Sequence, residues 1–138
     1  MEIIDKVGVK IDKSRWEQIW KSLTPRPGEV ILVDDREIAL YNLQYRGKEG
    51  PTDVLSFPLE GGFPFQPLGS VVISVETARR NAEKLGHTLQ EELQLLLIHG
   101  LLHLLGYDHE KDNGEMRSEE RKLIEKFNLP PSLIVRSE

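Results

Sequence analysis

Residues 89–105 limit how this chain can fold more than any other stretch, because they are apolar on nearly every side of a helix. The apolar members are Leu89, Leu93, Leu95, Leu96, Leu97, Ile98, Leu101, Leu102, Leu104 and Leu105. A helix with this pattern is buried all round instead of lying half exposed on a surface. The capping-box sequence Thr88-Leu89-Gln90-Glu91 predicts where the helix begins. We therefore expect a central, buried helix.

Two histidines, His99 and His103, lie inside this apolar helix, and a buried imidazole needs partners for its nitrogens. Residues four apart project from one face of a helix, so both rings can reach one ion at the usual Zn–N distance of about 2.0–2.1 Å. Gly106 favours a left-handed turn just past the helix. This turn can bring His109 back as a third ligand. We predict that the three histidines bind one divalent ion, with zinc as the expected metal.

The spacing H-x-x-x-H-x-x-G-x-x-H is that of the metzincin zinc motif. Structural zinc usually has four protein ligands, often cysteines, whereas catalytic zinc keeps a position for water. The chain has no cysteine, so three imidazoles indicate a catalytic site. Asp108 either supplies a fourth ligand, orients an imidazole, or is simply an acid in a tight turn. His87, in a polar turn before the capping box, is expected at the surface.

Gly100 stands where H-E-x-x-H peptidases carry the glutamate that acts as general base. Without that side chain, peptide hydrolysis loses general acid–base help, typically worth about 10²–10⁴ in rate. Phosphodiester cleavage depends less on this position, since a metal and basic groups can stabilise the charge that develops on phosphate oxygens. The pattern makes a nuclease plausible and weighs against a peptidase.

Composition indicates one ordinary globular domain over residues 1–138, with 38% hydrophobic and 30% charged residues. Neither a secretory signal nor an apolar run long enough to cross a bilayer is recognisable, so we expect a cytoplasmic protein without a membrane partner. The net charge of −5 argues only mildly against a nucleic-acid partner, because the position of charges matters more than their sum.

The remaining patterns predict an α+β fold, a small mixed sheet packed with helices. Strands are expected near residues 3–11 and at 29–33, 53–57 and 70–75. Helices are expected after capping signals at Ser14 and Asp34, and over residues 76–85, 89–105 and 113–127, with Gly86 ending the first of these three. Alternating acids and bases over residues 110–126 are typical of an exposed helix with many ion pairs.

Three segments of the chain carry long, specific motifs: YRGKEGPTDVLSFP at residues 45–58, LGSVVIS at 68–74 and HGLLHLLGYDH at 99–109. These motifs, in this order and over nearly the whole chain, resemble the YbeY family of bacterial rRNA maturation factors. The resemblance implies a zincin-like (metalloprotease-like) α+β fold whose central helix carries the metal. It also implies a zinc-dependent, single-strand-specific endoribonuclease that matures the 3′ end of 16S rRNA and serves ribosome quality control.

The resemblance assigns one Zn²⁺ per chain to His99, His103 and His109, and a functionally important arginine to Arg46. The partners it implies are single-stranded or precursor rRNA and the ribosome, and no DNA is expected. Taken without the family, Arg46 lies in a polar turn after the second helix, where a solvated charge is an alternative to bidentate phosphate binding. The family usually has Leu-Gly-Asp before its apolar strand; Ser70 replaces that acid here, and its role is not transferred.

Three further segments have open interpretations. Residues 53–57 would shape a substrate groove if they formed an edge strand beside the metal, and would otherwise be a core strand. Arg79, Arg80 and Lys84 would bind RNA backbone if they faced the cleft, although a solvated helix face is the default. The loop 60–67 is either a mobile flap that stacks bases or ordinary packing.

Two other functions remain as alternatives to the nuclease. A metallopeptidase of metzincin-like type is favoured by the histidine spacing and opposed by Gly100. A ribosome assembly factor with a mainly structural metal is the other, because metal ligands that join a helix to its following turn can stabilise the fold itself.

Overall fold

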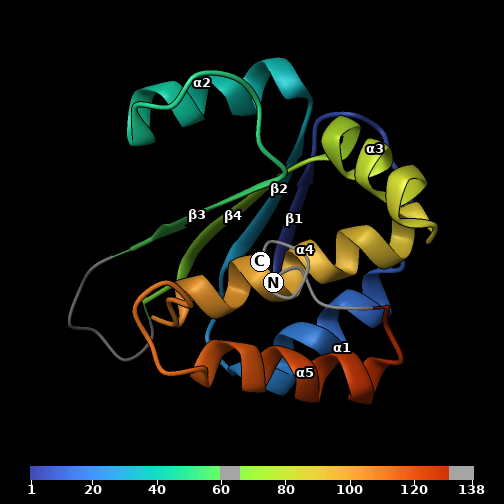
Figure 1. Ribbon diagram of the computed structural model, residues 1–138, viewed down its shortest axis with the longest axis vertical. Coiled ribbons are helices and arrows are strands. Elements are labelled where there is room, and N and C mark those ends of the chain that lie inside the picture. Colours follow the sequence, from blue (N-terminus) through green and yellow to red (C-terminus); the bar gives the residue numbers. More distant parts are fainter. Residues whose placement is uncertain (60–65, 131–138) are drawn as a thin grey trace.

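Four strands form one mixed sheet in the computed structural model, which describes residues 1–59 and 66–130 (Figure 1). The strands are β1 (Glu2–Asp5), β2 (Glu29–Val33), β3 (Val54–Pro58) and β4 (Gly69–Ser74). Their spatial order is β1-β2-β4-β3, with β1, β2 and β4 parallel and β3 antiparallel to β4 at one edge. The predicted α+β class with a small mixed sheet is confirmed.

The first strand ends much earlier than the predicted range 3–11. The side chain of Asp5 accepts hydrogen bonds from the backbone N–H groups of Val7 and Gly8, at 3.0 and 2.9 Å. Gly8 has a φ of +75°, so the backbone turns away from the sheet here. The other three strands lie within one residue of the predicted ranges.

Helix α4 (Leu89–Leu104) is the central helix of the fold, as predicted. Its start at the Thr88 capping box is confirmed, with both reciprocal bonds to Glu91 present. Every residue from Glu92 to Leu102 is buried. The helix packs against β3, β4, α1, α3 and α5, which explains why it is apolar on all sides.

Helices α1 (Lys13–Leu23) and α5 (Glu115–Phe127) lie with α4 on one face of the sheet (Figure 1). The predicted N-cap of α1 at Ser14 is wrong: Asp12 caps the helix by accepting from the N–H of Arg15 at 3.1 Å, and Ser14 lies in the first turn. Asp is as good an N-cap as Ser, and its earlier position adds two residues to the helix.

The remaining helices of the described residues are α2 (Asp35–Arg46) and α3 (Val75–Leu85). α2 covers the face of the sheet opposite α4, over a small core of Val33, Ile38, Leu55 and Val72. Asp34 caps α2 and Gly86 ends α3 in the left-handed conformation, both as predicted. The two faces therefore carry different layers: α4 with its neighbours on one, and α2 on the other.

Two other findings bear on the predictions. Among the described residues, no helix combines the length and apolar character needed to cross a membrane. The loop 60–67 falls largely outside the described part, which omits residues 60–65, so its interpretation as a flap stays a prediction.

Candidate metal centre and cleft

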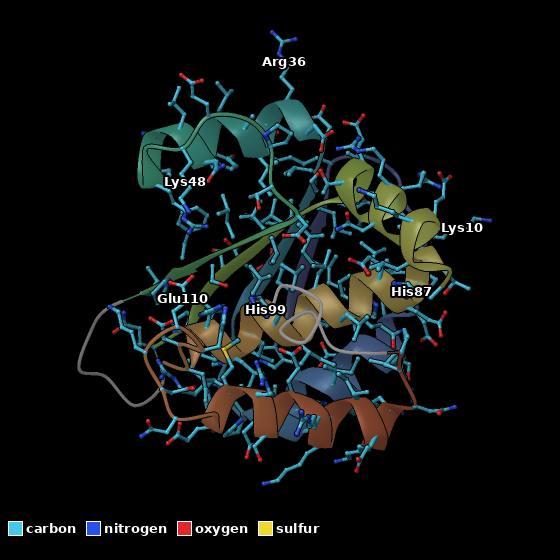
Figure 2. All side chains as sticks on the ribbon, in the orientation of Figure 1. Lys10, Arg36, Lys48, His87, His99 and Glu110 are labelled. Atoms are coloured by element: carbon cyan, nitrogen blue, oxygen red, sulfur yellow. The ribbon has the colours of Figure 1, made fainter. Side chains whose placement is uncertain are left out.

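His99 and His103 project side by side from the last turns of α4, as their spacing predicts (His99 is labelled in Figure 2). Their Nε2 atoms are 3.2 Å apart and their ring centroids 4.7 Å apart. Two nitrogens bound to one zinc ion at a tetrahedral angle lie roughly 3.4 Å apart. The two rings therefore already have nearly the separation that a shared ion requires.

The turn after α4 brings His109 back to the two helical histidines. Gly106 has a φ of +98° and its N–H donates to the carbonyl of His103 at 3.0 Å, which reverses the chain. The ring centroid of His109 lies 5.7 Å from that of His99 and 5.8 Å from that of His103. One nitrogen from each ring lies within 4.8 Å of the other two, so the three predicted side chains converge.

The donor atoms of this cluster fit a cation. Nδ1 of His109 is buried and has no hydrogen-bond partner within residues 1–59 and 66–130. Most buried polar nitrogens have a partner, and a bound ion is one explanation for an atom without one. Three imidazole nitrogens suit zinc, and also nickel, copper or iron. Asp108 is not part of the group; its Oδ1 accepts from the N–H of Glu110 at 3.0 Å, which favours the tight-turn interpretation.

A buried acid, Glu120 of α5, contacts the histidine cluster from behind. Its Oε2 lies 3.4 Å from Nδ1 of His99, and its side chain is 1% exposed. This contact leaves Nε2 of His99 directed towards His103. A carboxylate on the distal nitrogen of a metal-binding histidine orients the ring and raises its basicity.

The charge pattern of residues 110–126 predicts an exposed helix and therefore gives no sign of a buried Glu120. α5 does carry a surface ion pair, between Lys122 and Glu119 at 3.1 Å. However, Glu120 shares the buried face with Met116, Leu123 and Phe127. An acid at helical spacing within an apolar stripe was the signal that could have revealed it.

His103 is held in the form that a metal needs. Burial lowers the pKa of His103 from its ordinary value of 6.5, and the neighbouring His99 ring lowers it further. A neutral imidazole keeps a lone pair that can bind a cation. Near neutral pH the ring is therefore ready to act as a ligand.

Gly100 is required by packing, which explains the missing glutamate. A Cβ on this residue would lie 2.6 Å from Cγ1 of Val71 and 3.2 Å from Cγ2 of Val54, closer than side chains tolerate. The hydroxyl of Ser56 also donates to the Gly100 carbonyl at 2.8 Å. The glycine lets α4 lie directly on β3 and β4, and a side chain at this position would point into that contact.

The histidines open into a cavity of about 800 Å³. Its wall is formed by the end of α2, by β3 with the residues before it, and by the end of α4 with the following turn. β3 is an edge strand beside the histidines, which is the condition set above for a substrate groove. The volume lies within the roughly 300–1,000 Å³ typical of ligand sites.

Arg46 lines this cavity, but its predicted place in a polar turn is wrong. It is the last residue of α2, and Gly47, with a φ of +64°, ends the helix behind it. The guanidinium is exposed and has no hydrogen bond or ion pair with the rest of the described chain. It is therefore available to an anionic ligand in the cleft.

The basic residues of α3 do not reach the cleft. Arg79, Arg80 and Lys84 are all exposed, and none of them lines the cavity. Arg80 instead binds the Asp35 carboxylate at 2.7 Å. The default interpretation, a solvated helix face, is the correct one.

The surface position predicted for His87 is wrong. Its Nε2 lies 2.6 Å from Oε1 of Glu92, and the two side chains are 8% and 0% exposed. Asn81 lies 3.4 Å from the other oxygen of Glu92. The polar turn before α4 packs between helices, and its histidine partners a fully buried acid.

Ser70 is matched to its neighbour across the sheet. It pairs in register with Glu29, and its hydroxyl donates to Oε1 of Glu29 at 2.6 Å. An aspartate at position 70 would place two carboxylates together. Ser70 does not line the histidine cleft.

Comparison with known proteins yields consistent matches over most of the chain. Residues 12–128 match the family model described as endoribonuclease YbeY. Three proteins named endoribonuclease YbeY illustrate the sequence similarity to this chain. That of Nautilia profundicola is 53% identical over 134 residues, covering 97% of this chain and 96% of its own. That of Campylobacter jejuni is 54% identical over 121 residues, covering 88% and 90%. That of Helicobacter pylori is 51% identical over 139 aligned positions, covering 100% and 99%.

A solved structure has the same fold. The solution structure of TM1509 from Thermotoga maritima matches with a TM-score of 0.60 and 32% sequence identity. The match covers 91% of this chain and 88% of that one. The arrangement of sheet and helices described above is thus shared with an experimentally determined relative.

Proposed function

The chain belongs to the endoribonuclease YbeY family, and from this premise we propose that it cleaves single-stranded RNA in a cleft that holds one metal ion. The observation that carries the proposal is the convergence of three imidazoles within 4.8 Å at the floor of an open cavity. His99, His103 and His109 would hold the ion, with zinc as the proposed metal. A divalent ion in this place supplies Lewis-acid stabilisation to a phosphoryl oxygen and makes water a better nucleophile.

The chain's own residues would bind and orient the substrate. Arg46 presents its guanidinium to the same cavity as the histidines, without a partner in residues 1–59 and 66–130, and its planar fork suits the two oxygens of a phosphate. Glu120 would keep the His99 ring oriented from behind. Edge strand β3 forms the cavity wall between Arg46 and the three histidines, so an extended strand of RNA can lie across β3.

The rival functions are less well supported. A peptidase of the metzincin type needs a general base beside the first histidine, and the packing of Gly100 against Val71 leaves no room for one. A purely structural metal would be enclosed by protein ligands. His103 and His109 are half-buried and border an open cavity, which favours a site that substrate can enter.

The biological substrate we propose is precursor rRNA, at the 3′ end of 16S rRNA, with the ribosome as partner and the cytoplasm as location. The support is family membership together with the pattern of the cleft, since a single exposed strand at an rRNA end fits an open groove. Cleavage of purified precursor particles, compared with mature ones, tests this assignment. Equal cleavage of both would remove it.

The nuclease itself is tested by single-turnover cleavage of a labelled single-stranded RNA with ribonuclease-free protein. We expect His103→Ala and Arg46→Ala to lose most activity and Arg46→Lys to recover part of it, while circular dichroism confirms folding. Lys84→Ala, on the solvated face of α3, is the matched control and should cleave like the unmodified chain. If the folded histidine variant cleaves equally well, the activity belongs to a contaminant.

Two further measurements test the metal and the peptidase alternative, and a third identifies the nucleophile. Metal analysis of the purified protein identifies the ion and gives its ratio to chain. A peptide-library digest under the same conditions tests the peptidase, and detectable turnover there would contradict the role given to Gly100. The termini of the RNA products distinguish attack by water, which leaves a linear phosphate or a 3′-hydroxyl, from attack by the 2′-hydroxyl, which leaves a cyclic phosphate.

A further inference from the structure

A small aromatic cluster borders the cleft on the side of α2. The ring centroid of Tyr45 lies 5.2 Å from that of Phe57 at 69°, and 6.4 Å from that of Tyr41 at 44°. Tyr41 and Phe57 also contact each other, with centroids 6.3 Å apart at 77°. Both of these pack against the small core under α2. The cluster therefore joins the core to the rim of the cleft.

Tyr45 is the exposed member of this cluster. It is 61% exposed and lines the cavity next to Arg46, while Tyr41 and Phe57 are half-buried. The tilted contacts to two rings support Tyr45 from one side and leave the rest of the ring open. Aromatic pairs in such edge arrangements are attractive and hold their orientation. The Tyr45 ring is thus held in place by two neighbouring rings and still accessible to a ligand.

The position of Tyr45 relative to the histidines defines a path for the substrate. Leu55 and Phe57 of β3 face the core under α2, whereas Val54 and Ser56 face Gly100 of α4. In Figure 2, Lys48 lies just beyond the end of α2 and His99 on α4, with the strands crossing between them. A molecule that contacts both Tyr45 and the histidines must therefore pass over the outer edge of β3.

Single-stranded nucleic acid fits this combination of an open aromatic ring, an exposed guanidinium and an edge strand. Unpaired bases stack on exposed aromatic side chains, while arginines bind the phosphates between them. A base inside a duplex has both faces covered by its neighbours, so it would first have to be extruded. Stacking on Tyr45 would thus select unpaired strands without reading their sequence.

We propose that Tyr45 is the stacking platform for one unpaired base of the RNA substrate and that this contact makes the cleft selective for single strands. The inference rests on the proposed function, because it assumes an RNA strand in the cleft. Arg46 binds the phosphate beside the stacked base. The scissile linkage lies further along the strand, beyond the edge of β3, at the three histidines.

The test replaces one base at a time along a labelled single-stranded RNA by an abasic site. For the unmodified chain, one position is expected where loss of the base lowers kcat/KM by about 5- to 150-fold, the range for one base–aromatic stack. Tyr45→Leu should lower kcat/KM by a similar factor on the intact RNA and show no further loss at that position. Tyr45→Phe, which keeps the ring, should restore the sensitivity to the abasic site.

The controls separate stacking from a structural effect. Leu43→Ala removes an exposed apolar side chain from the same helix outside the cleft and should leave both activity and the abasic profile unchanged. If Tyr45→Leu and the unmodified chain lose the same factor at every abasic position, Tyr45 stacks no base and the inference is overturned.

A binding measurement keeps this outcome distinct from failure of the nuclease. An RNA with 2-aminopurine at the sensitive position, or at each position in turn, should lose fluorescence on binding to the unmodified chain and not to Tyr45→Leu. Quenching without cleavage by the unmodified chain would overturn the proposed nuclease and leave the stacking platform in place. Cleavage by the unmodified chain with equal quenching in both proteins would overturn the stacking platform and leave the proposed nuclease in place.

Discussion

The carboxylate of Glu120 lies 3.4 Å from Nδ1 of His99, although the two residues are 21 positions apart and on different helices. This distance is at the long end of the hydrogen-bond range. The acid is 1% exposed, so its charge acts in an environment poor in water. The contact joins α5 to the candidate metal centre and predicts a role for α5 in metal binding.

Glu120→Gln is expected to weaken metal binding by about 10- to 100-fold, the usual effect of altering the group behind a histidine ligand. The amide keeps the shape of the carboxylate but removes its negative charge. Competition with a fluorescent chelator measures the affinity. Glu119→Gln, on the exposed face of the same helix, is the matched control and should bind metal like the unmodified chain. Equal affinities for both variants would assign Glu120 a packing role alone.

Gly100→Ala should lower the free energy of unfolding by about 1 kcal/mol. The added Cβ would lie 2.6 Å from Cγ1 of Val71. Overpacking of this kind costs about 1–3 kcal/mol, and the better helix propensity of alanine offsets about 1 kcal/mol of it. Urea denaturation measures the difference.

A double-mutant cycle with Val71→Ala checks the cause of this destabilisation. Removing the valine methyls makes room for the new Cβ, so Gly100→Ala should cost less in the Val71→Ala background. Additive effects would mean that the contact with Val71 is not the reason for the glycine. Gly100→Glu restores the peptidase motif, but we expect this variant to unfold and therefore to show no peptidase activity.

Asp35, the first residue of α2, ties this helix to β4 and α3. Its Oδ1 accepts from the hydroxyls of Ser74 and Thr77, both at 2.6 Å, and its Oδ2 accepts from Arg80 at 2.7 Å. Burial raises the pKa of Asp35, but the hydrogen bonds from these three groups outweigh it. The pKa therefore lies below its ordinary value of 3.8.

A lowered pKa in the folded state makes the carboxylate stabilising above pH 3.8, and this stabilisation is lost as the pH falls through the folded-state pKa. Asp35→Asn should therefore be less stable than the unmodified chain near neutral pH, and should lose less stability on acidification. Melting temperatures between about pH 2 and pH 7 measure both effects. Glu125→Gln, an exposed acid on α5, is the control. Parallel pH profiles for Asp35→Asn and the unmodified chain would contradict this role.

Ser70→Asp should destabilise the chain more than Ser70→Ala at neutral pH. The alanine loses one hydrogen bond to a charged acceptor, worth about 1.5–3 kcal/mol. The aspartate loses the same bond and also faces the carboxylate of Glu29, with which Ser70 now bonds at 2.6 Å. Thermal unfolding of both variants gives the comparison. Glu29→Gln should rescue Ser70→Asp, and a failure to rescue would show that the two side chains do not interact.

Local sequence was sufficient for the features that depend on neighbours along the chain. The capping box at Thr88, the apolar period of residues 89–105 and the left-handed Gly106 all act within a few residues. The spacing of His99 and His103 is set by the helical repeat itself. The helical repeat brings His99 and His103 together, and the turn at Gly106 directs the chain so that His109 can join them. The predicted start of a helix was wrong where two residues could act as the N-cap, as with Asp12 and Ser14.

The sequence by itself thus predicted the helices, the approximate positions of the strands and the histidine cluster, because capping, helical spacing and turn preferences act within a few residues. Tertiary structure decided which side chains from distant segments meet: Glu120 behind His99, His87 against Glu92, and Tyr45 across β3 from the histidines. Such meetings depend on how the layers stack and on the burial that follows. No periodicity within one segment contains that information.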